Sequence, residues 1–265
     1  MNRRVALGLT VVWLAVLCAS ARAVMLRYTP KVGGKASYQY AVTSTIDATM
    51  AGERMHSQSF MQMTATHTVL AKTSRGMRVE VAMRNRSMAM TMPGSKGPTN
   101  QKMPDSTATV VIDQRGHTER VKAAGQDRAA MSHDPLSDIV DSIMLPGKDV
   151  KPGDTWFDTL DTKGGGAAPA ANITFTSRLV ELTTRRRRRC AKITTTFMGT
   201  MGGAGAPGSG NVQGTAVQYY DYENSLWVEA EAKLTITRKI PAAKGAKAPG
   251  GSTLTRITTT MKLKK

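Results

Sequence analysis

Methionine is the residue type whose number and spacing could support chemistry in this chain. The chain has 265 residues and 17 methionines, nine of them within residues 50–92. In two short segments methionine occupies every second position: Met61 and Met63, then Met88, Met90 and Met92. Alternate residues of a strand share one face, and thioethers either bind Cu(I) or fill irregular apolar interiors. We expect an apolar interior or ligand pocket, with a Cu(I) site as the weaker alternative.

Five consecutive arginines, Arg185, Arg186, Arg187, Arg188 and Arg189, form the second feature. Adjacent like charges repel one another, so the run is expected at a solvated hairpin tip between two strands. Basic side chains are also attracted to an anionic membrane or envelope surface. Nucleic acid is not an expected partner, because no aromatic residue interrupts the run to stack on bases.

Catalytic motifs are absent from the sequence. The four histidines, at positions 56, 67, 117 and 133, form no triad or metal-binding spacing, and no G-x-S-x-G, H-E-x-x-H or phosphate-binding glycine loop occurs. Cys190 is the only cysteine after residue 23, and we expect it to be buried in a strand rather than reactive. The chain is therefore predicted to be non-enzymatic, with no catalytic residue, no resident metal and no cofactor.

The N-terminus has the features of a secretory signal peptide. Arg3 and Arg4 precede an apolar run, residues 5–17, and the segment ends in Ala21-Arg22-Ala23. This is a positive region, an apolar region too short to span a bilayer, and an A-x-A cleavage site. We expect residues 1–23 to be a signal peptide and residues 24–265 a single β-rich domain exported to the periplasm or the extracellular space. The net charge of +18 makes that domain strongly basic.

Alternation of apolar and polar residues is the main structural pattern. It runs through residues 36–50 and 53–69, joined by Ala51-Gly52, and predicts a long hairpin. Residues 77–92 are predicted to form a third strand. Its apolar residues change from odd-numbered to even-numbered positions along the strand, so a bulge is expected near Asn85-Arg86. Further strands are predicted at 107–112, 117–122, 155–162, 173–183, 190–198, 212–222, 226–239 and 253–263.

One helix is expected among these strands, at about residues 133–145. Asp134-Pro135 would begin it, its apolar residues follow helical spacing, and Pro146-Gly147 would end it. The predicted fold is mainly β: long antiparallel hairpins form a strongly curved sheet or half-open barrel with this short helix packed on it.

Several short motifs resemble those of exported bacterial β-rich proteins of uncharacterised function. They are Leu26-Arg27-Tyr28, Tyr38-x-Tyr40, Lys151-Pro152-Gly153-Asp154-Thr155-Trp156, Cys190-Ala191-Lys192-Ile193 and Tyr219-Tyr220-Asp221-Tyr222-Glu223. The resemblance implies that the Trp156 motif opens a strand and that the Asp221 segment lies in a late hairpin. The architecture more loosely resembles the half-open barrels of the periplasmic lipoprotein carrier, which implies apolar-ligand binding.

The leading hypothesis is an exported cell-envelope protein that binds an apolar or lipid-like ligand between sheet and helix. Its candidate ligand-binding residues are Met61, Met63, Met88, Met90, Met92 and Trp156, although a core position is the first expectation for Trp156. The alternative is a structural or surface-interaction protein with a packed interior, whose residues 185–189 contact anionic envelope polymers. An apolar cavity large enough for a lipid would separate the two hypotheses.

Overall fold

The computed structural model describes residues 23–50, 52–120, 144–162, 170–202, 209–240 and 250–264. These residues form fourteen strands: β1 Val24–Met25, β2 Lys35–Met50, β3 Glu53–Thr73, β4 Gly76–Thr91, β5 Thr99–Lys102, β6 Ser106–Ile112, β7 Thr118–Arg120, β8 Asp149–Val150, β9 Thr155–Thr162, β10 Ala171–Arg185, β11 Arg188–Met201, β12 Gly210–Asp221, β13 Leu226–Ile240 and β14 Gly251–Leu263. No helix occurs in these ranges, and the predicted helix at 133–145 falls almost wholly outside them.

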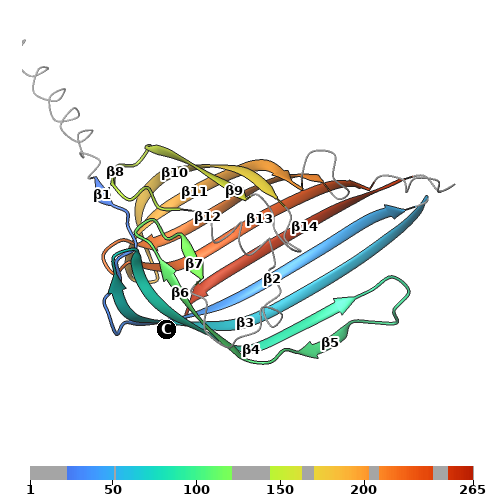
Figure 1. Ribbon diagram of the computed structural model, residues 1–265, viewed down its shortest axis with the longest axis horizontal. Coiled ribbons are helices and arrows are strands. Elements are labelled where there is room, and N and C mark those ends of the chain that lie inside the picture. The colour runs from blue at the N-terminus through green and yellow to red at the C-terminus, as the bar shows by residue number, and fades with distance from the viewer. Residues whose placement is uncertain are drawn as a thin grey trace, which may run out of the picture.

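Twelve strands form one antiparallel sheet, in the order β7-β6-β4-β3-β2-β14-β13-β12-β11-β10-β9, with β5 also paired to β4. Figure 1 shows the long strands side by side in a curved sheet, with β1 and β8 at the end opposite the tip of the β2–β3 hairpin. The sheet does not close, because β7 and β9 are its two ends. The predicted mainly β, half-open barrel is confirmed.

The first hairpin follows the sequence pattern closely. Strands β2 and β3 pair from Met50 opposite Glu53 to Lys35 opposite Thr68. Gly52 in the link has a φ of 86°, which a glycine adopts without steric cost. The register between β3 and β4 shifts beside Asn85, whose φ is 52°, so the predicted bulge is confirmed.

The N-terminal segment closes one end of the barrel. Leu26 is fully buried, and Val24 pairs with Val150 in the small β1–β8 sheet. The Tyr220 hydroxyl donates a hydrogen bond to the Arg27 carbonyl at 2.6 Å. The surrounding core includes Ile112 of β6 and residues of β9 to β12, so the two ends of the sheet converge here.

A second core lies on the inner face of strands β10 to β14. Its buried side chains are Ile173, Phe175, Phe197, Met201, Val212, Ala216, Ala232, Leu234, Ile236 and Ile257. Within each strand these residues recur at alternate positions, the period that places side chains on a single face. The inner, concave face of the sheet is therefore its apolar face.

Candidate functional site

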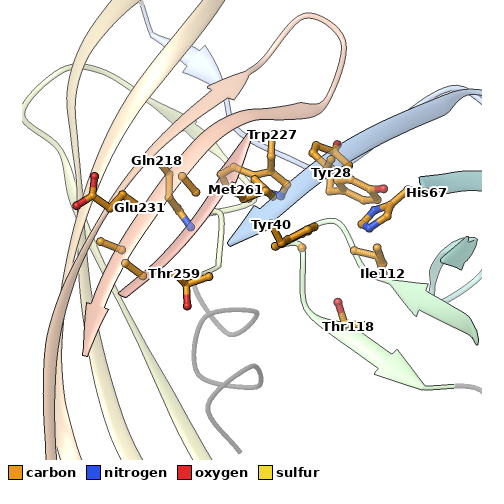
Figure 2. Close-up of a pocket in the computed structure, with 15 residues that line it drawn as sticks. Tyr28, Tyr40, His67, Ile112, Thr118, Gln218, Trp227, Glu231, Thr259 and Met261 are labelled. Atoms are coloured by element: carbon orange, nitrogen blue, oxygen red, sulfur yellow. The ribbon is translucent and has the colours of Figure 1, made fainter. Parts of the chain in front are cut away.

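A pocket of about 100 Å³ opens on the concave face of the sheet. Figure 2 shows Tyr28, Tyr40, His67 and Trp227 around one space, whereas the carboxylate of Glu231 points away from it. Its walls combine aromatic and apolar residues of β2, β6 and β12 to β14 with Tyr28 of the N-terminal segment: Tyr28, Tyr38, Tyr40, Ile112, Ala216, Trp227, Ala230, Ala232 and Met261. Typical ligand sites measure about 300–1,000 Å³, so this pocket would accommodate part of a lipid rather than a whole one.

Three titratable side chains of the wall, Tyr28, Tyr38 and His67, are held in their uncharged forms. Burial raises the pKa of Tyr28 to about 12 and also raises the pKa of Tyr38. Burial lowers the pKa of His67 from 6.5 to about 4, so its imidazole is neutral at neutral pH. The ring of His67 packs edge-on against Tyr38, with centroids 4.9 Å apart. These neutral rings favour an apolar guest over an ionic one.

Gln218 is the buried polar group in this wall. Only 5% of its surface is exposed, and its Oε1 atom has no hydrogen-bond partner among the described residues. A buried acceptor without a partner costs free energy. A hydrogen-bond donor on a bound molecule would relieve that cost.

The candidate methionines continue the concave face beyond the pocket. Met63 lies opposite Tyr40 and Met61 opposite Val42 across the β2–β3 pair, and Met61 also faces Met88 across β3–β4. Directly opposite residues in antiparallel strands share a face. Met61, Met63, Met88 and Met90 are half-buried, and Met92, just past the end of β4, is 53% exposed. They form a partly covered strip beside the pocket, and none lines it.

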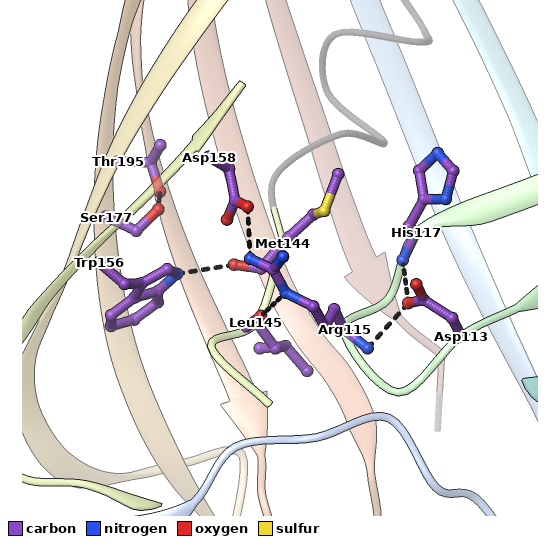
Figure 3. Close-up of polar contacts among 9 residues, drawn as sticks. All are labelled: Asp113, Arg115, His117, Met144, Leu145, Trp156, Asp158, Ser177 and Thr195. Carbon is purple, nitrogen blue, oxygen red and sulfur yellow. Dashed lines mark hydrogen bonds and ion pairs between the residues drawn. The ribbon is translucent and has the colours of Figure 1, made fainter. Parts of the chain in front are cut away.

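Trp156 lies away from the pocket. Its side chain is buried in the core of the closed end, and its indole nitrogen donates a hydrogen bond to the Met144 carbonyl at 2.9 Å (Figure 3). Trp156 does not line the pocket, and a ligand-binding role for it stays a prediction. The first expectation, a core position at the start of a strand, is confirmed.

The same region links the two ends of the sheet. In the turn between β6 and β7, Arg115 donates a hydrogen bond from Nε to the Leu145 carbonyl at 3.2 Å and forms an ion pair with Asp158 of β9. Asp113 holds this turn by accepting hydrogen bonds from the backbone N–H groups of Arg115 and His117 (Figure 3). These contacts keep the barrel narrow at the closed end.

Replacing Trp156 with Phe should lower the free energy of unfolding by about 1–2 kcal/mol, because the Met144 carbonyl loses its donor in a buried place. Binding to the concave pocket should stay unchanged. Urea unfolding and titration with a fluorescent fatty acid would measure the two quantities. A Trp156→Phe variant with normal stability and weakened fatty-acid binding would place Trp156 in the ligand site.

The five arginines form the predicted hairpin tip, but they are not free in solvent. Arg186 and Arg187 make the turn between β10 and β11, with φ values of 50° and 62°. The other three form ion pairs: Arg185 with Glu229, Arg188 with Asp221, and Arg189 with Glu223. The expected solvated hairpin tip is confirmed, because Arg185, Arg186, Arg187 and Arg189 are exposed, but the ion pairs with acids on neighbouring strands and turns were not expected.

Asp221 is the buried member of these pairs. Its side chain is fully buried and accepts hydrogen bonds from Arg188 at 2.8 Å and from the backbone and side chain of Asn224. Burial raises the pKa of this carboxyl, but the hydrogen bonds from Arg188 and Asn224 outweigh it, so the pKa lies below its usual value. Asp221 is thus ionised, and Arg188 balances its buried negative charge.

Cys190 follows the arginines and is fully buried, as expected. Burial raises the pKa of its thiol to about 11, so the reactive thiolate is scarce at neutral pH. Within the described ranges, no group of three or more His, Cys, Asp or Glu side chains is arranged to hold a metal ion. No helix in those ranges is long and apolar enough to cross a membrane.

Sequence reasoning missed most of the pocket wall. Tyr38 and Tyr40 belong to the apolar set of their strand, and Trp227 and Gln218 lie in alternating segments. Alternation identified the inner face of β2, but it placed Trp227 with the polar residues Glu229 and Glu231, and the register between β12 and β13 shifts beside Trp227. Alternation contained no signal that Gln218, in a position expected for an apolar residue, would face the same space as Tyr28.

No family model and no curated protein sequence matches the chain. Among solved structures, lipovitellin, described for its lipid–protein interactions, superposes with a TM-score of 0.52 at 7% sequence identity. The match covers 89% of this chain and 26% of that one, so the chain spans about a quarter of lipovitellin's length. This likeness shows a shared curved β fold.

Two further structures superpose with TM-scores of only 0.27. One is an outer membrane channel from Pseudomonas putida F1, with 10% identity over 89% of this chain and 97% of that one. The other is a protein with a YmcC-like fold from Bacteroides fragilis NCTC 9343, with 11% identity over 92% of this chain and 100% of that one. The resemblance to an exported bacterial family stays a prediction.

Proposed function

We propose that the chain is an exported, non-enzymatic protein that binds an apolar or lipid-like ligand on the concave face of its half-open barrel. The observation that carries the proposal is the pocket of mainly aromatic and apolar side chains that opens on that face. Hydrophobic walls with a few placed polar groups are typical of small-molecule sites. Export rests on the predicted signal peptide, residues 1–23.

The chemistry of the wall suggests how such a ligand lies. One end of the molecule enters the pocket between Tyr40 and Trp227, where it meets the side chain of Gln218. The apolar remainder follows the half-buried methionines of β3 and β4, starting at Met63 beside Tyr40. Flexible thioether side chains adapt to ligands of different shape, so this strip would accept a range of acyl chains. The fold likeness to lipovitellin is in keeping with a lipid-like ligand.

Filling the pocket tests the proposal. Ala230 lines it and is half-buried, so Ala230→Phe would place a ring in the ligand's space without opening the core. We expect this variant to bind the fluorescent fatty acid cis-parinaric acid about tenfold more weakly, a loss of about 1.4 kcal/mol. Fluorescence titration would measure both dissociation constants.

Ala41→Phe is the matched control. Ala41 is a half-buried alanine whose neighbours in β2, Tyr40 and Val42, face inward, so its own side chain faces outward. This variant should bind the fatty acid as the unchanged protein does. Absence of binding by the unchanged protein, or equal losses in both variants, would refute the ligand site and favour the alternative of a structural surface-interaction protein.

A further inference from the structure

A second groove lies on the convex face of the sheet, opposite the apolar pocket. It encloses about 440 Å³ and is lined by Ser37, Gln39, Arg186, Lys262, Leu263 and Lys264. Ser37 and Gln39 alternate with the inward-facing Tyr38 and Tyr40, which places the groove on the outer face. Three cationic side chains from two distant parts of the chain therefore meet at one outer groove.

Backbone contacts fix the positions of these cations. Arg186 donates a hydrogen bond from its guanidinium to the Leu263 carbonyl at 2.5 Å, which anchors the β10–β11 tip beside the end of β14. The backbone N–H of Lys264 donates to the Ser37 carbonyl at 2.7 Å, which holds the end of β14 against β2. The guanidinium of Arg186 keeps other N–H donors available, because one bond uses only one of its five.

The acid nearest the groove is already neutralised. Glu229 lies directly opposite Lys262 across β13–β14, and it forms an ion pair with Arg185 at 2.8 Å. The hydrogen bond from Arg185 is the main cause that lowers the pKa of Glu229, with smaller contributions from Lys262 and Arg186. Neither Lys262 nor Lys264 forms an ion pair with any residue that the structure describes. The groove therefore carries a net positive field facing outward.

We propose that this groove binds the phosphate headgroup of an anionic lipid and so docks the convex face of the protein on a membrane surface. An anchored guanidinium and two exposed ammonium groups match phosphate oxygens in charge and in hydrogen bonding. Of the five arginines, this role belongs to Arg186, with its neighbour Arg187 at the tip, whereas Arg185, Arg188 and Arg189 are engaged in ion pairs. The site is independent of the apolar pocket and lies on the opposite face.

Vesicle partition tests the assignment. The double variant Lys262→Gln with Lys264→Gln removes two cations that have no ion-pair partner in the described ranges, so the fold should be unaffected. Partition onto phosphatidylcholine vesicles containing phosphatidylglycerol should weaken about thirty-fold, since each basic residue near an anionic surface contributes about 1 kcal/mol. Arg186→Asn, which tolerates the positive φ of the turn, should weaken partition about fivefold on the same basis.

The matched control is Lys72→Gln with Lys102→Gln, two exposed lysines outside the groove whose loss changes the net charge equally. Its partition should stay close to that of the unchanged protein. Equal losses in both double variants would show that overall charge, not the groove, attracts the membrane. If the unchanged protein partitions onto pure phosphatidylcholine vesicles as strongly as onto vesicles that contain phosphatidylglycerol, apolar insertion rather than headgroup binding attracts it. Groove-dependent binding of inorganic phosphate without vesicle binding would show a small-anion site, and each of these three results would overturn the proposal.

Discussion

Replacing Arg188 with Met should lower the free energy of unfolding by about 3–5 kcal/mol, the range for removing one partner of a buried ion pair. Asp221 is fully buried, and Arg188 is its only cationic partner among the described residues. Without the guanidinium, the carboxylate would be left with hydrogen bonds but no opposite charge. Urea unfolding followed by tryptophan fluorescence would measure the loss.

Arg189→Met is the matched control, because it removes the same side chain at the adjacent position. Arg189 also forms an ion pair, with Glu223, but both side chains are about half exposed. Exposed pairs contribute less than about 1 kcal/mol, so this variant should be only slightly destabilised. Similar losses in the two variants would show that the burial of Asp221 does not decide the stability of the hairpin tip.

Acidification should destabilise the protein through His67. The unfolded chain binds a proton on this imidazole below about pH 6.5, whereas in the folded protein the pKa is about 4 because the ring is buried. The unfolded state therefore binds more protons between these values, and stability falls as the pH falls. A shift of this size corresponds to at most about 3 kcal/mol lost between neutral pH and pH 4.

His67→Gln should remove that part of the pH dependence, whatever its effect on stability at neutral pH. His117→Gln is the control, because the His117 side chain is exposed. The free energy of unfolding should be measured for all three proteins from about pH 7 to about pH 4. If the unchanged protein and His67→Gln lose stability in parallel, His67 is not kept neutral by the fold.

The role of the hairpin tip was only partly accessible from the sequence. Adjacent like charges indicated that Arg185–Arg189 must reach solvent, and the turn at Arg186-Arg187 agrees with that. The acids that pair with the run lie 33 to 44 residues further along the chain, in other strands and turns. Such pairing depends on which strands become neighbours, which charge spacing within one segment does not encode.

The short strands β1, β5 and β8 were not predicted, but the sequence by itself determined the longer strands, the first hairpin and the bulge near Asn85. These features follow from a two-residue period and from turn residues, which act over a few positions. Only the tertiary structure decided that β14 pairs with β2, which joins the long strands β2, β3 and β4 to the long strands β10 to β14. That pairing brings Met261 beside Tyr40 and so builds the pocket, and it also brings Lys262 and Lys264 beside Gln39 and Ser37. Contacts between strands some 200 residues apart depend on how the whole sheet curves, so no local pattern could have predicted either site.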